Sequence, residues 1–171
     1  MEQLDDKPIS AEEFYARIGK YLTPRQVEFV REAYNFAAEA HAKQKRASGE
    51  PYIIHPLGVA TILAQLQMDD VTLAAAFLHD VVEATDWGFD DLEDEDVPSE
   101  ITDALKLLTH EEGTDYYDYV QRIIDSGNTT AINVKLNDLT HNIARGKAFG
   151  YENLVQKHEK ALEMIKKSLQ E

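Results

Sequence analysis

The sequence contains no cysteine, which excludes disulfide bonds and thiolate metal sites and favours a reducing, cytoplasmic setting. It also lacks long apolar runs, since none approaches the roughly 18 residues that a membrane span requires. The first eight residues show neither the basic segment nor the apolar segment of a secretory signal. These absences predict a cytoplasmic protein that does not associate with membranes.

Basic residues are scarce relative to acidic ones. The chain has 17 Lys and Arg against 32 Asp and Glu, a formal net charge of −15 at pH 7. Such a surface repels polyanions, so binding to a DNA or RNA polymer is not expected. A small phosphorylated ligand remains compatible with this charge if cations or a metal ion gather locally. We interpret most of the carboxylates as serving solubility. No pattern in the sequence specifies an oligomeric state.

The length of 171 residues predicts one domain, comprising residues 1–171. Almost every segment has apolar residues at helical spacing, and no strand pattern finds a partner strand. We therefore predict an all-α fold of about seven to eight helices. The acidic segment 86–98 is predicted as a surface loop, and Gly146 and Gly150 are predicted to bracket a break. The predicted helices span residues 10–19, 23–41, 56–66, 71–84, 101–108, 114–125, 132–143 and 154–169.

Three places carry metal-binding side chains where an apolar core is expected: His55, the adjacent pair His79 and Asp80, and Asp138. A single His in a helix is more often a hydrogen-bonded core residue than a ligand. A His-Asp pair inside a buried helix is harder to explain, because a buried carboxylate needs a charged partner. A divalent cation is such a partner. Two His nitrogens with two carboxylate oxygens suit Mn²⁺, Fe²⁺, Co²⁺ or Zn²⁺ better than Ca²⁺.

Glu83 follows His79 by four residues and Asp80 by three, so a continuous helix places all three on one face. In that position Glu83 would stand beside a bound metal and could orient a water molecule or accept its proton. The alternative interpretation is a solvated carboxylate near a helix end.

Phosphate binding requires cations, and two segments supply them. Lys45 and Arg46 precede the Ser48-Gly49 turn, on the loop that leads to His55. Lys135 and Asn142 share a helical face with Asp138, so a cation and an amide flank the candidate ligand. The alternative for both segments is an ordinary solvated surface.

Three motifs together resemble the HD-type hydrolases of the RelA/SpoT family. The first is Arg46-Ala-Ser-Gly-Glu-Pro-Tyr-Ile-Ile-His-Pro56, which is similar to the entry motif of that family. The second, His79-Asp-Val-Val-Glu83, resembles the HD signature. The third, Val134-Lys-Leu-Asn-Asp-Leu-Thr-His-Asn142, resembles the distal Asp motif. The motifs occur in the family's order, and the resemblance covers about residues 25–145.

The resemblance implies an HD-domain helical bundle and a stand-alone small alarmone hydrolase. It implies a divalent metal ion, Mn²⁺ first among candidates, and a catalytic role for Glu83. The family reaction removes the 3′-pyrophosphate from (p)ppGpp and leaves GDP or GTP. By position, the nucleotide would contact Arg46, Ser48 and Asn142. The implied metal ligands are His55, His79, Asp80 and Asp138.

Two positions depart from the family pattern. The family has Glu-Asp where this chain has Glu83-Ala84, and the missing Asp helps to place the attacking water. The family also often has a basic residue where this chain has Ala47. The metal set is intact, but three alternatives remain open beside (p)ppGpp hydrolysis. These are hydrolysis of another nucleotide or phosphoester, a weakened nucleotide-binding module, and a purely structural helical domain. Asp86 is a candidate substitute for the missing Asp.

Overall fold

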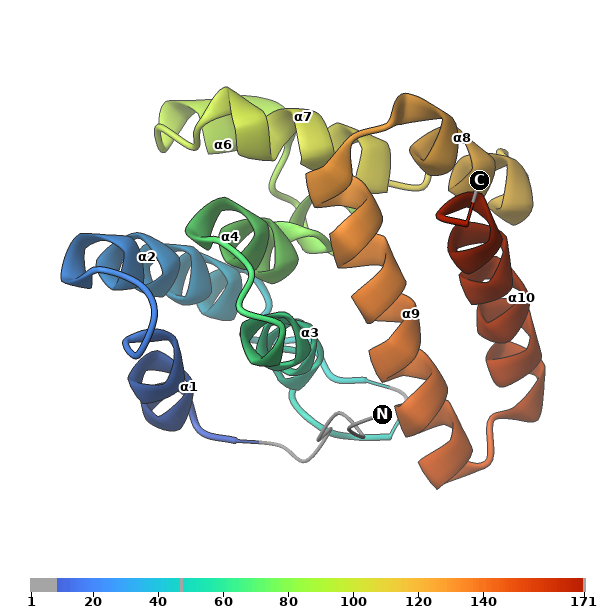
Figure 1. The fold of residues 1–171 in the computed structure, drawn as a ribbon, viewed down its shortest axis with the longest axis horizontal. Coiled ribbons are helices and arrows are strands. Elements are labelled where there is room, and N and C mark those ends of the chain that lie inside the picture. The colour runs from blue at the N-terminus through green and yellow to red at the C-terminus, as the bar shows by residue number, and fades with distance from the viewer. Residues whose placement is uncertain (1–8, 47, 171) are drawn as a thin grey trace.

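The computed structural model describes residues 9–46 and 48–170 (Figure 1). Within these ranges the chain forms helices α1 to α10 and no strand, apart from one isolated bridge between Lys45 and Pro51. The predicted all-α class is confirmed. Eight of these helices have eight or more residues, and two short ones, α5 and α6, add to the predicted number. No helix in the described ranges combines the length and apolarity that crossing a membrane requires.

The first two helices begin at N-caps that coincide with the starts of the predicted ranges 10–19 and 23–41. In α1 (Ala11–Ile18) the Ser10 side chain accepts from the N–H of Glu13, and in α2 (Pro24–Ala40) Thr23 and Gln26 form a reciprocal capping box. Pro24 lies at the start of α2, where its missing N–H costs no hydrogen bond.

The centre of the molecule is formed by α3 (Ile54–Gln65) and α4 (Asp70–Leu78), which are buried over most of their length. A single helix over residues 71–84 was predicted, and this prediction is wrong. The chain divides into α4 and α5 (Val81–Ala84), with His79 and Asp80 at the junction. The ring Nδ1 of His79 lies 2.5 Å from the carbonyl of Ala76. In a continuous helix that carbonyl would accept the N–H of Asp80.

The acidic segment also differs from prediction, because it contains α6 (Phe89–Asp94). The Gly88 N–H donates to the Asp91 carboxylate, and the buried Leu92 anchors the short helix against α7 (Ser99–Leu108). After α7 comes α8 (Tyr116–Ser126), which ends at Gly127 in the left-handed conformation, with φ of 64°.

The last two helices, α9 (Thr129–Phe149) and α10 (Glu152–Ser168), pack side by side in opposite directions (Figure 1). The predicted break at Gly146 is wrong, since α9 continues to Phe149 and ends at Gly150. A Cβ at Gly146 would lie 2.7 Å from Cγ2 of Val155, so this glycine permits close packing of α10. Helix α9 also contacts α3 and α4, which brings three helices to one polar centre in an otherwise apolar core.

Candidate metal centre and adjoining cavity

Four side chains from distant parts of the sequence converge where α3, α4 and α9 meet: His55, His79, Asp80 and Asp138. One potential ligand atom from each lies within 4.8 Å of all the others. His55, His79 and Asp138 are almost fully buried, with 2%, 4% and 5% of their surface exposed. These are the four residues that the sequence resemblance nominates. The structure brings all of them together.

Short distances join the ring nitrogens to the carboxylates. Nε2 of His55 lies 2.7 Å from Oδ1 of Asp138, and Nε2 of His79 lies 3.2 Å from the same oxygen. Oδ2 of Asp80 lies 3.1 Å from Nε2 of His79 and 3.6 Å from Nε2 of His55. Both Nε2 atoms therefore face the same two carboxylates.

Side chains around the cluster hold these groups in place. The Tyr52 hydroxyl donates to Oδ2 of Asp80 at 2.8 Å, and its ring packs against the buried His41. The Ala76 carbonyl accepts from Nδ1 of His79, so in the neutral ring the lone pair available to a metal ion is on Nε2. The sequence analysis did not nominate Tyr52, which lies only three residues before His55 inside the quoted entry motif.

Lys135 is the nearest cation to the cluster. Its ammonium lies 3.1 Å from Oδ2 of Asp138, and only 8% of the residue is exposed. Burial acts to raise the pKa of Asp138, but the Lys135 charge and the short contacts with the His55 and His79 rings hold that pKa well below its usual range. The sequence nominated Lys135 for substrate binding; in the structure it lines the adjoining cavity, and its charge is paired with Asp138.

The arrangement fits a divalent cation. Asp80 and Asp138 carry two negative charges, and Lys135 neutralises one of them. Burial also acts to raise the pKa of Asp80, yet the positive charge of a protonated His79 keeps it below its usual value, and a bound cation would take the place of that proton. A buried site with excess negative charge and two imidazole nitrogens is chemically matched to a first-row transition metal ion.

A cavity of about 390 Å³ opens above the four residues. Glu83 lies in its wall, and one carboxylate oxygen accepts the His110 N–H at 2.6 Å. Although Glu83 is accessible from solvent, desolvation by the cavity wall raises its pKa, and the His110 N–H offsets only part of this effect. A carboxylate with a raised pKa beside a metal site is suited to accept a proton.

The nominated substrate-binding residues lie in two places. Lys45, Arg46 and Asn142 line the cavity. Asn142 accepts from Arg46 at 2.8 Å and lies 3.3 Å from Asp138, so it connects the entry loop to the metal cluster. Ser48 instead lines a smaller recess of about 80 Å³, which shares Arg46 and Asn142 with the cavity. Ala47 lies outside the described residues.

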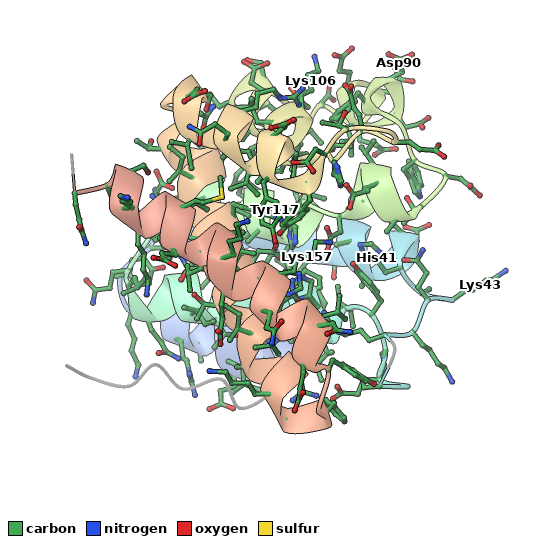
Figure 2. All side chains as sticks on the ribbon, turned by 90° about the vertical axis from the view of Figure 1, so that its right-hand side faces the viewer. His41, Lys43, Asp90, Lys106, Tyr117 and Lys157 are labelled. Carbon is green, nitrogen blue, oxygen red and sulfur yellow. The ribbon has the colours of Figure 1, made fainter. Side chains whose placement is uncertain are left out.

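Lys157 is a cavity residue that the sequence analysis missed. It comes from α10, and its ammonium lies 4.1 Å from the centroid of the Tyr116 ring. Figure 2 shows Lys157 on the face where α10 lies in front, whereas Lys43 extends away from the body of the molecule. No carboxylate in the described ranges pairs with Lys157. The packing of α10 on α8 and α9 brings Lys157 to the site, so no local sequence motif predicts its position.

Ala84, which stands where the family has Asp, and the candidate substitute Asp86 are both absent from the described residues that line the cavity. The Ala84 carbonyl accepts a hydrogen bond from the Gln44 side chain, and Asp86 is exposed to solvent. Glu83 is therefore the one carboxylate outside the four-residue cluster that lines the cavity in the described chain.

Comparison with known proteins agrees with this architecture. Residues 33–114 match the family model described as HD domain. That range contains His55, His79, Asp80 and Glu83, while Asp138 lies beyond it.

Curated relatives match a central segment of the chain. A guanosine-3′,5′-bis(diphosphate) 3′-pyrophosphohydrolase of Vibrio cholerae is 53% identical over 74 residues, which is 43% of this chain and 10% of the relative. The bifunctional (p)ppGpp synthase/hydrolase SpoT of Escherichia coli is 50% identical over 76 residues, 44% of this chain and 11% of the relative. The chain thus spans about a tenth of the length of these relatives.

Among solved structures, the chain is similar to a metazoan orthologue of SpoT that is described as hydrolysing ppGpp. The TM-score is 0.58 and the sequence identity is 25%, over 80% of this chain and 93% of the other. The likeness extends well past residues 33–114 and supports the arrangement of the helices described above.

Proposed function

We propose that the protein is a metal-dependent phosphohydrolase whose substrate is (p)ppGpp, a proposal supported by the match of residues 33–114 to the HD domain model. The products would be GDP or GTP and pyrophosphate. The observation that carries the proposal is the convergence of His55, His79, Asp80 and Asp138 beneath a cavity that also holds Glu83 and unpaired cations. The names and described activity of the relatives point to the same reaction.

In this proposal the metal is held by His55, His79, Asp80 and Asp138. We propose Mn²⁺ as the bound ion and the cytoplasm as the location of the protein. A bound ion would polarise a phosphate oxygen and lower the pKa of a bound water. Glu83 accepts the proton of the attacking water, helped by its raised pKa and its fixed contact with the His110 N–H. Arg46, which donates a hydrogen bond to Asn142, orients the nucleotide. Lys45, which lines the cavity, attracts the phosphates.

The direct test is hydrolysis of ppGpp by the purified protein with Mn²⁺, with the Ala84→Asp variant assayed alongside. We expect the wild-type chain to release GDP and pyrophosphate in equal amounts. Activity confined to Ala84→Asp would show that the pocket is correct and that Ala84 weakens catalysis. Absence of turnover in both variants would contradict the proposal and direct attention to other nucleotides.

Lys157 provides a test of the phosphate-binding side of the cavity. Since its charge is not paired with a carboxylate, we expect Lys157→Ala to raise KM for ppGpp by about tenfold, the effect of losing roughly 1.4 kcal/mol of a charge-assisted contact, with a smaller change in kcat. Lys43→Ala is the matched control, because Lys43 is exposed and points away from the cavity (Figure 2). Equal KM values for the two variants would remove Lys157 from the binding site.

A further inference from the structure

We infer that His141 is a positioning residue for His55: when a metal ion is bound, Nδ1 of His141 accepts a hydrogen bond from Nδ1 of His55, which directs Nε2 of His55 toward the metal site. The inference rests on the proposed metal centre. The two Nδ1 atoms lie 2.9 Å apart, and the ring centroids are 5.0 Å apart with 36° between the ring planes. Only 2% of His55 and 3% of His141 are exposed, so water does not compete for this contact.

The direction of this hydrogen bond follows from what Nε2 of His55 must do. A ring nitrogen that binds a metal offers a lone pair, so a neutral His55 ligand carries its proton on Nδ1. The facing Nδ1 of His141 must then accept, and the proton of His141 resides on its own Nε2. The Ala76 carbonyl serves Nδ1 of His79 in the same way, so both candidate His ligands have an outer acceptor.

Gly58 provides the space for the His141 ring. A Cβ at position 58 would lie 2.3 Å from Nε2 of His141, 2.6 Å from Cδ2 and 2.9 Å from Cε1. A glycine inside a helix costs roughly 1 kcal/mol relative to alanine, and its place in α3 is explained by this close approach. Helix α3 thus carries both His55 and Gly58, the glycine that leaves room for the His141 ring. Helix α9 carries Asp138 and His141 on adjacent turns.

The test is Mn²⁺ affinity, measured by electron paramagnetic resonance, in the full chain and two variants. His141→Leu removes the acceptor, and we expect the affinity to fall about 10- to 100-fold. His141→Asn places Oδ1 near the position of Nδ1, so an acceptor remains, and we expect affinity within about threefold of wild type. Unchanged affinity in His141→Leu, or equal losses in both variants, would overturn the inference.

A second measurement does not depend on how the variants fold. In wild-type protein labelled with ¹⁵N-histidine and loaded with diamagnetic Zn²⁺, NMR reports which ring nitrogens are protonated. We expect a proton on Nδ1 of His55 and none on Nδ1 of His141, and the reverse pattern would overturn the inference. Failure of the wild-type chain to bind either ion would instead reject the proposed metal centre, and this inference with it.

Discussion

Replacing Glu83 by Gln is expected to reduce turnover of ppGpp by about 10²- to 10⁴-fold while metal affinity stays near that of wild type. The amide keeps the shape of the side chain and still offers an oxygen to the His110 N–H, but it cannot take a proton. Steady-state assays give the loss in kcat, and Mn²⁺ titration gives the affinity. Glu93→Gln is the matched control, because Glu93 is exposed and lies outside the cavity.

The pH profile separates a proton acceptor from a residue that only shapes the cavity. Desolvation raises the pKa of Glu83 above its ordinary value of 4.5. As the carboxylate must be ionised to act as a base, activity should fall as the pH drops through this raised pKa. The fall of activity on the acidic side of the pH profile should therefore occur at higher pH than a Glu with an ordinary pKa would give. The pH profile of the residual activity of Glu83→Gln should lack this fall. Full activity in Glu83→Gln would reject this role.

The largest effect on stability is expected for Asp138→Leu. The substitution leaves the Lys135 ammonium buried without its carboxylate partner, and such a loss costs about 3–5 kcal/mol of unfolding free energy. The interaction is strong because the charge of Asp138 keeps the pKa of Lys135 well above its usual value, although burial acts in the opposite direction. Urea denaturation of chelator-treated protein measures the change without a contribution from bound metal.

The double variant Lys135→Met, Asp138→Leu tests the cause of that loss. It removes both buried charges, and the Asp138→Leu change is common to both variants, so most of the lost unfolding free energy should return. Metal binding should not return, because a carboxylate ligand is still missing. If the double variant were as unstable as Asp138→Leu alone, the ion pair would not be the reason for the loss.

The helical architecture was largely predictable, because apolar spacing and caps are local properties of the chain. The caps at Ser10, Thr23 and Asp69 all form where polar side chains precede apolar runs. The errors have tertiary causes. Gly146 predicted a helix break, but in the structure it allows α10 to pack closely on α9. Segment 86–98 was predicted as a loop, but it contains α6, which is held by the buried side chain of Leu92.

Sequence motifs nominated His55, His79, Asp80 and Asp138, since each places a metal-binding group in an apolar context. They also nominated Glu83 by its spacing, although α4 ends at Leu78 and the continuous helix behind that argument does not exist. The residue types and motifs therefore nominated four side chains that the structure brings together, while metal binding by them and the catalytic role of Glu83 stay predictions.

What only the tertiary structure decided is how these groups are partnered. Lys135 is a buried counter-ion of Asp138 and not a free cation, Lys157 reaches the cavity from α10, and His141 meets His55 across 86 positions of sequence. The physical reason is that helical spacing relates residues three or four apart, whereas hydrogen bonds between α3, α9 and α10 depend on how those helices pack.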